Sequence, residues 1–251
     1  MAAPRFYIPP ENCRSRSLRL DGREAHHALH VLRLTRGDGV TVLDGVGNTY
    51  RCEVENTTKD SLTLAVREKI CAPAPPCPLT LLVAVPKGKI IEDIIEKAVE
   101  LGVRRVVPLL TERVVTQLDA AGAAAKQQKW RQVAIEAIKQ CGAAWLPEVA
   151  APQAIQACLT RSEEIELQLV GSLQTERRHP REWIQEFQRQ RGRLPRSAGA
   201  WIGPEGDFTL AELQAIEAAG AKPITLGALT LRVETAAIYC LSFMNYELRG
   251  N

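Results

Sequence analysis

No run of apolar residues in this sequence approaches the length of a membrane span. The longest runs, such as LTLLVAV at 79–85, fall far short of the roughly 20 residues that a spanning helix needs. No signal-peptide pattern opens the chain, and its 7 cysteines include no CxxC pair. An odd number of scattered cysteines argues against both a disulfide framework and a zinc site. These absences predict a cytoplasmic protein with reduced thiols, no membrane contact and no bound metal.

The sequence also lacks the common phosphate-binding motifs. Its most loop-like turn, GPEGDF at 203–208, has the spacing of neither a P-loop nor a GxGxxG fingerprint. This turn sets Glu205 and Asp207 where a phosphate would lie, and two carboxylates repel an anion. We therefore expect it to hold a neutral or cationic ligand, such as an adenine ring and a sulfonium.

One break in composition divides the chain. Four prolines between Pro73 and Pro78 cannot lie inside a helix or a central strand, so we interpret 71–78 as a stiff linker. Residues 1–70 before it contain short alternating runs, a hairpin signal within 45–48 and one short helical stripe. This pattern predicts a small β-barrel domain with one helix.

Residues 79–251 show a different pattern, in which predicted strands alternate with predicted amphipathic helices. Strand-like runs occur at 79–85, 104–110, 165–171, 198–203 and 222–227. Such alternation is typical of an α/β fold with a parallel sheet covered on both faces. Three of these runs end in Gly171, Gly203 and Gly227. Each glycine alone is explained by a tight turn, but three at equivalent positions favour a binding site, because ligands of open parallel sheets bind beyond the carboxyl ends of the strands.

Two C-terminal stretches carry a family resemblance. GPEGDFTLAEL at 203–213 and ITLGALTLRVETA at 224–236 resemble the RsmE family, the 16S rRNA (uracil-N3)-methyltransferases of the SPOUT superfamily. RFYIP at 5–9, HVLRLTRGD at 30–38 and the stretch that starts PKGKIIEDIIEKAVELG at 86 follow in the family's order. Each segment alone is weak evidence for the family. The ordered set, however, covers nearly the whole chain and is specific for this family.

The resemblance implies a fold, a cofactor and partners. It implies a PUA-like β-barrel that helps to bind RNA, then a parallel-sheet SPOUT domain with a C-terminal trefoil knot, assembled as a homodimer. S-adenosylmethionine would lie bent in the knot, contacted mostly by backbone, with leucines against the adenine. The implied cofactor-binding residues are Val170, Gly171, Ile202, Gly203, Pro204, Glu205, Gly206, Leu226, Gly227, Leu229, Thr230 and Leu231.

The implied product is 3-methyluridine in the decoding region of the small subunit. Uracil N3 carries a weakly acidic hydrogen, so its methylation requires a general base or a cation that stabilises the uridinate. Arg232 and Glu234, within LRVETA, are the catalytic candidates, with Arg232 as the charge stabiliser. The alternative reading of Arg232 is a surface ion pair, and that of Glu234 is a carboxylate favoured by a helix N-terminus.

Basic residues near turns are the candidates for RNA contact, because a net charge of +3 is too small to be diagnostic by itself. Those that lie in family-like segments are Arg5, Arg33, Lys87, Lys89, Lys97 and Arg113. Each of them alone is more often a solvated charge. A metal site is one interpretation of His26, His27 and His30. No carboxylate or cysteine cluster accompanies them in the sequence, so we predict no metal.

Four positions depart from the family's pattern. Lys139 and Ala143 replace a usual glutamate and arginine, Leu229 replaces an arginine, and Asp207 replaces a glycine of the GPEGG turn. The missing arginines keep two alternatives open. One is a SPOUT enzyme that methylates a ribose 2′-hydroxyl or another base, and the other is a non-catalytic RNA-binding or ribosome-assembly protein.

Overall fold

The computed structural model describes residues 3–113, 119–160, 165–174 and 177–249, and it divides into two compact units. One unit comprises Met1–Ala74 with Ile135–Leu146, and the other comprises Pro75–Ala134 with Pro147–Asn251. The main boundary falls within the proline-rich segment. The sequence did not indicate that residues 135–146 group with the first unit.

The first unit contains a curled five-stranded sheet in the order β1-β3-β4-β5-β2. β1 runs parallel to β3, and the other neighbours are antiparallel. The hairpin predicted at 45–48 joins β3 to β4, with Gly45 and Gly47 both at positive φ. The strands are β1 (Arg5–Tyr7), β2 (Ser17–Leu20), β3 (Gly39–Leu43), β4 (Asn48–Thr57) and β5 (Leu62–Cys71), and the helical segments are η1 (Pro10–Asn12), α1 (Gly22–His26) and the π-helical η2 (His27–Val31).

The last residues of helix α3 (Ala120–Cys141) belong to this first unit and explain one departure from the family. Lys139 donates from Nζ to Glu24 of α1 at 2.8 Å and to Glu136 at 3.0 Å. The Lys139 side chain is only 9% exposed and that of Glu24 only 16% exposed. A glutamate at position 139 would face two carboxylates, so lysine here satisfies a local charge requirement.

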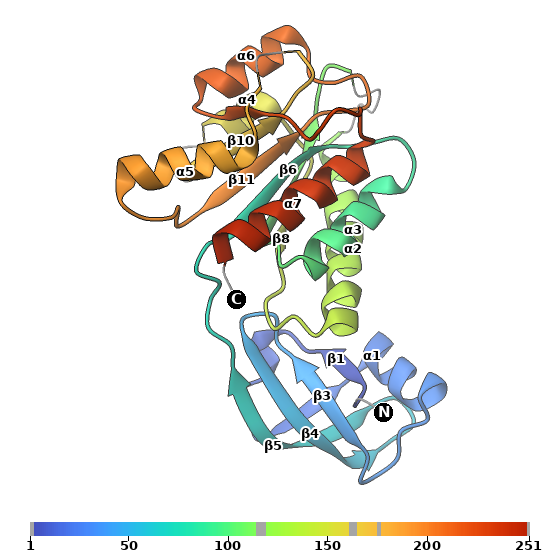
Figure 1. Cartoon of the computed structure of the whole chain (residues 1–251). Coiled ribbons are helices and arrows are strands. Elements are labelled where there is room, and N and C mark those ends of the chain that lie inside the picture. Colours follow the sequence, from blue (N-terminus) through green and yellow to red (C-terminus); the bar gives the residue numbers. More distant parts are fainter. Residues whose placement is uncertain (1–2, 114–118, 161–164, 175–176, 250–251) are drawn as a thin grey trace. The chain divides into compact units, whose positions relative to one another are not determined.

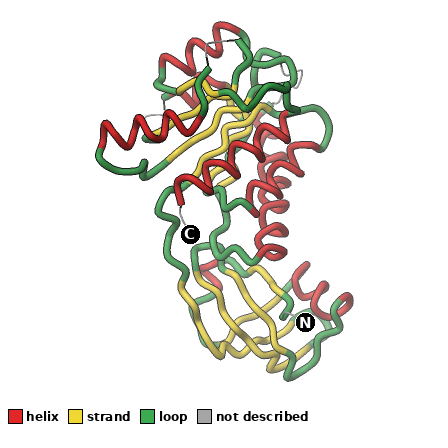
Figure 2. The backbone as a smooth tube through the Cα atoms, in the orientation of Figure 1, coloured by secondary structure: helices red, strands yellow, loops and turns green. Residues whose placement is uncertain are grey.

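The second unit has a sheet in the order β12-β10-β11-β6-β7-β8, with β9 also paired to β7, and every pair is parallel. Figure 2 shows its strands in yellow among the red helices. The strands are β6 (Leu79–Ala84), β7 (Arg105–Leu110), β8 (Glu148–Val149), β9 (Gln153–Ala154), β10 (Leu167–Gly171), β11 (Ala198–Ile202) and β12 (Lys222–Ile224). Besides α3, the helices are α2 (Ile90–Glu100), α4 (Ile155–Leu159), α5 (Pro180–Arg191), α6 (Leu210–Ala218) and α7 (Val233–Arg249).

Helices cover both faces of this sheet, as the sequence predicted. α7 contacts β6 and β11 on one face and is flanked by α2 and α5 (Figure 1). On the other face α4 and α6 pack over a core that contains Trp201, Phe208 and Leu82. All five predicted strands are present. The short elements β8, β9 and α4 were not predicted, because two-residue strands and a one-turn helix carry almost no periodic signal.

A charge cluster beside β10 gives a pH-dependent prediction. The carboxylate of Glu166 accepts hydrogen bonds from both terminal nitrogens of Arg193, at 2.8 and 2.7 Å, and from the backbone N–H of Arg196, at 2.7 Å. These hydrogen bonds lower the pKa of Glu166 to about 2. A depressed carboxyl pKa adds stability above its unfolded value, and that stability is lost as the pH falls through the folded value.

We therefore expect Glu166→Gln to destabilise the protein most at neutral pH. The difference in the free energy of unfolding between the wild type and this variant should shrink between about pH 5 and pH 2. Urea unfolding of both proteins at several pH values measures this difference. Glu68→Gln is a matched control, because the exposed Glu68 carboxylate pairs with Arg51 and accepts no backbone N–H in the described part of the chain. A pH-independent difference for Glu166→Gln would contradict the assignment.

Candidate functional site

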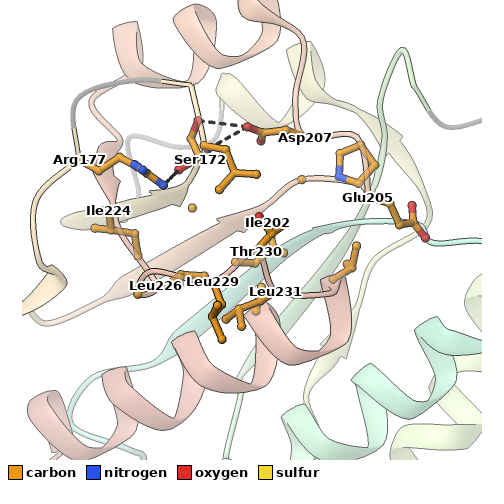
Figure 3. Close-up of a pocket in the computed structure, with 17 residues that line it drawn as sticks. Ser172, Arg177, Ile202, Glu205, Asp207, Ile224, Leu226, Leu229, Thr230 and Leu231 are labelled. Carbon is orange, nitrogen blue, oxygen red and sulfur yellow. Dashed lines mark hydrogen bonds between the residues drawn. The ribbon is translucent and has the colours of Figure 1, made fainter.

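Three strand ends of the parallel sheet meet at one pocket. Gly171 at the end of β10 lies opposite Ile202 of β11 on one side and opposite Ile224 of β12 on the other. The segments that follow these positions, with the start of α7, line a pocket of about 590 Å³ that is partly open to solvent (Figure 3). Its place beyond the carboxyl ends of the strands suits a small-molecule ligand.

The floor of the pocket is apolar. Ile202, Ile224 and Val233 are at most 3% exposed, and the half-buried Leu226 and Leu231 extend the same surface. Figure 3 shows the leucine side chains gathered beside α7. An apolar floor of this kind suits a flat ring system, because it removes the faces of the ring from water.

The 203–208 turn forms one rim and is held by its backbone. The N–H of Asp207 donates to the carbonyl of Pro204 at 2.8 Å. A Cβ at Gly203 would lie 3.1 Å from the backbone nitrogen of Phe208, a tight contact that would require the turn to shift. On the other rim Gly227 has a φ of 110°, a conformation that side chains rarely adopt. The glycines here therefore permit two tight turns around one pocket. Both explanations given by the sequence, a tight turn and a binding site, thus apply.

Charged groups of opposite sign line the pocket. Arg177 donates from Nη1 to the carbonyl of Ser172 at 3.2 Å, and its guanidinium lines the pocket. Glu205 and Asp207 line it as well, and in the view of Figure 3 Arg177 and Glu205 lie on opposite sides. A ligand with both a cationic and an anionic group would therefore find a partner for each.

The cofactor-binding residues predicted from the sequence all line this pocket except Val170 and Gly206. Val170 is fully buried in the core beneath α4 and α6, because alternation along β10 turns its side chain away. The carbonyl of Gly206 accepts a hydrogen bond from Arg113.

Sequence reasoning missed seven lining residues, which are Ser172, Leu173, Arg177, Asp207, Ile224, Val233 and Ala236. Ser172 and Leu173 directly follow a strand-end glycine, and that position was an available signal. Arg177 had no signal in the sequence, because its approach depends on the path of the loop after β10.

The two catalytic candidates lie where α7 begins. Arg232 is exposed, directly follows the lining residue Leu231, and makes no ion pair with any described residue. Glu234 is half-buried in the first helical turn. Neither lines the pocket itself, although Leu231 and Val233 beside them do. Arg232 is thus adjacent to the pocket, and Glu234 holds the position that the helix dipole favours for a carboxylate.

The six predicted RNA-binding residues fall into two groups. Arg33, Lys87 and Lys89 are exposed. The others have partners within their own units: Arg5 donates to the carbonyls of Lys139 and Gln140, Lys97 pairs with Glu96 and Glu100, and Arg113 donates to the carbonyls of Gly206 and Asp207. The Arg113 contacts tie the segment after β7 to the rim of the pocket.

The histidine rings of His26 and His30 lie 4.8 Å apart at their centroids. Among the described residues, no three metal-ligating side chains gather in one place. Within the same part of the chain, none of the helices has the length and apolar character needed to cross a membrane.

The chain matches models of two protein families. Residues 73–245 match the RNA methyltransferase domain, and residues 20–67 match the RNA methyltransferase PUA domain. Ribosomal RNA small subunit methyltransferase E of Synechocystis is 32% identical, over 99% of this chain and 79% of the relative. The enzyme of the same name from Bacillus subtilis is 29% identical, over 92% of each chain.

Solved structures agree with these relatives. A methyltransferase of Legionella pneumophila, in complex with the bound cofactor SAM, aligns with a TM-score of 0.86 at 28% identity over 97% of both chains. Ribosomal RNA small subunit methyltransferase E of Neisseria gonorrhoeae, bound to S-adenosyl methionine, aligns with a TM-score of 0.80 at 25% identity over 97% of both chains. The family resemblance of the sequence motifs is thereby confirmed, and this chain belongs to the ribosomal RNA small subunit methyltransferase E family.

Proposed function

We propose that this protein transfers a methyl group from S-adenosylmethionine to N3 of one uridine in the decoding region of 16S rRNA. The observation that carries the proposal is the pocket at the ends of β10, β11 and β12, in a chain of this family. The pocket combines an apolar floor with charged groups of both signs. It lies between two turns, one with the crowded Gly203 and one with Gly227 in a left-handed conformation.

The residues of the pocket fit S-adenosylmethionine. The apolar floor of Ile202, Leu226 and Leu231 suits the adenine, and the backbone of the two turns offers hydrogen-bonding groups to its edge. Glu205 favours the positive charge of the sulfonium and the ammonium. Arg177 is the candidate partner for the carboxylate of the methionine moiety. When bound, the sulfonium supplies an electrophilic methyl group.

The protein's part in the chemistry concerns the uracil. Methylation at N3 forms an N3–CH3 bond, breaks the S–CH3 bond and removes the N3 proton, so negative charge develops on the uracil carbonyl oxygens and N3. We assign the stabilisation of that charge to Arg232, which directly follows the lining residue Leu231, is exposed and has no competing ion pair among the described residues. The role assigned to Glu234 is to hold the start of α7 through the helix dipole.

The remaining features of the proposal concern RNA, assembly and location. Lys87, Lys89 and Arg33 are the exposed basic groups assigned to RNA phosphates. We propose a homodimer because the family resemblance implies one, and Leu229 at the pocket and Tyr246 on α7, each 78% exposed, are candidate contacts to the second copy. We also propose that the C-terminal segment forms the trefoil knot of its family. The 7 free cysteines and a ribosomal substrate are consistent with action in the cytoplasm.

The test is methyl transfer to ribosomal subunits. The purified protein is incubated with labelled S-adenosylmethionine and small subunits from a strain that lacks the gene, and the rRNA is digested to nucleosides that are identified by mass. We expect label in 3-methyluridine only. Mature subunits from the parent strain serve as the matched control and should accept no label, because their site is already methylated.

Other outcomes separate the alternatives. Label in a ribose-methylated nucleoside or another base would replace the proposed specificity by that of a related RNA methyltransferase. Binding of the cofactor without transfer to any ribosomal substrate would instead favour a non-catalytic RNA-binding or ribosome-assembly protein.

A further inference from the structure

Asp207 holds a backbone conformation that favours glycine. Its φ is 64°, and the only other non-glycine residue with positive φ in the described part of the chain is Arg33. A left-handed conformation at a residue with a side chain costs free energy, and such residues persist where their surroundings require them. The family resemblance places a glycine at this position, so an aspartate here needs a local reason.

The Asp207 carboxylate joins the two segments that border the pocket. Its Oδ2 accepts the backbone N–H of Leu173 at 2.9 Å, the side-chain amide of Gln174 at 3.2 Å and the hydroxyl of Ser172 at 3.4 Å. Its Oδ1 accepts the N–H of Phe208 at 2.8 Å, within its own turn. Figure 3 shows the Asp207 carboxylate directed at Ser172 across the top of the pocket. One side chain thus links the segment after β10 to the turn after β11.

Three further hydrogen bonds extend this link. The amide of Gln174 also donates to the carbonyl of Phe208, and the guanidinium of Arg113 donates to the carbonyls of Gly206 and Asp207. Segments that follow three different strands, β7, β10 and β11, therefore converge on residues 206–208. A glycine at position 207 would leave the backbone N–H of Leu173 without this acceptor.

We propose that Asp207 is a positioning residue for the methyl donor. Its carboxylate fixes residues 172–174 against the 203–208 turn, so that both rims of the pocket hold their places before the ligand binds. Ordering these rims in advance lowers the conformational cost of binding, which raises affinity without any new contact to the ligand. This inference rests on the proposed function, because it takes S-adenosylmethionine as the ligand of the pocket.

Calorimetry with S-adenosylmethionine tests the proposal on the wild type, Asp207→Asn and Asp207→Gly. We expect the Kd of Asp207→Gly to rise at least about tenfold, since several hydrogen bonds to a charged acceptor are lost. Asp207→Asn keeps the size and one acceptor oxygen and should lie between the two. At saturating S-adenosylmethionine the kcat for methyl transfer should stay within about threefold of the wild type, because positioning acts on binding.

Thermal unfolding without ligand distinguishes positioning from general stability. Replacement by glycine relieves the left-handed conformation while it removes the hydrogen bonds, so we expect the Tm of Asp207→Gly to move by no more than about 4 °C. Arg33 is in the other unit and also has a positive φ. The change in Tm of Arg33→Gly therefore measures the effect of relieving a left-handed conformation by itself. In a double-mutant cycle, Gln174→Ala should reduce the effect of Asp207→Gly on the Kd, because both act through the same segment.

S-adenosylhomocysteine, which lacks the sulfonium charge, distinguishes positioning from direct contact. Equal losses of affinity for S-adenosylmethionine and S-adenosylhomocysteine are expected. A loss confined to S-adenosylmethionine would overturn the proposal, because Asp207 would then contact the charged sulfur itself. An unchanged Kd in Asp207→Gly would also overturn it. A wild type that fails to bind S-adenosylmethionine would instead refute the proposed function on which the inference rests.

Discussion

Arg232→Met is expected to lower the kcat for methyl transfer by about 10²–10³, while the Kd for S-adenosylmethionine stays within about twofold. Arg232 is exposed at the start of α7, beside the lining residue Leu231, and it pairs with no carboxylate in the described part of the chain. Its charge is therefore available to the uracil as N3 loses its proton. A group that acts only on developing charge changes kcat and leaves cofactor binding unaltered.

Single-turnover transfer at saturating cofactor measures this effect. Arg232→Lys keeps the charge without the planar fork, and it should recover part of the rate. Arg189→Met, which removes an equivalent charge from the exposed end of α5, should transfer methyl groups at the wild-type rate. If Arg232→Met were as fast as Arg189→Met, the stabilisation of the uridinate would have to come from another group.

Trp201→Ala should lower the free energy of unfolding by about 3–5 kcal/mol, the range for large-to-small changes at buried aromatic residues. Trp201 is fully buried in β11, between β10 and β6, and packs with Phe208 and Leu213 in the core beneath α4 and α6. β11 continues directly into the 203–208 turn. The variant should therefore also bind S-adenosylmethionine more weakly, because Phe208, the last residue of that turn, packs in the same core.

The indole nitrogen gives this prediction an internal control. Trp201 donates from Nε1 to the side-chain oxygen of Gln168 at 2.8 Å, and both side chains are buried. Trp201→Phe keeps much of the packing but leaves Gln168 without this donor, which should cost about 1–3 kcal/mol. Trp201→Phe combined with Gln168→Leu removes the amide that has lost its hydrogen bond from the indole and should recover part of that loss. Urea unfolding of the four proteins measures the series, and a Trp201→Ala loss below about 1 kcal/mol would contradict it.

The fold could be predicted to a large extent because its main elements are long and periodic. The buried run at 79–85 and the stripe of Ile91, Ile94 and Ile95 each indicate one type of element, and each is present as predicted. The family motifs then fixed the class of fold. The inclusion of residues 135–146 in the first unit was not predictable, because it depends on pairs such as Lys139 with Glu24, which are far apart in the sequence.

The candidate site was predictable where backbone constraints have a sequence signal. Gly203 and Gly227 indicate turns from sequence alone, since a side chain would clash at the first and be strained at the second. Arg177 and Ser172 were missed, because their place at the pocket depends on how the segment after β10 folds back. The sequence indicated Asp207 only as a carboxylate of the turn and as a departure from the family's pattern. Its hydrogen bonds to Leu173 and Ser172 become visible only in three dimensions.

The alignment of Gly171 with Ile202 and Ile224 has a consequence for how the protein is made. The pocket draws on chain segments that are synthesised at different times, and its last contributors, Val233 and Ala236, are in α7. β11 must also insert beside β6, a partner more than a hundred positions earlier in the chain. A nascent chain that has not yet released α7 from its ribosome therefore has no complete pocket. Capacity to hold a methyl donor thus arises late in synthesis, so an interrupted translation product could not methylate RNA.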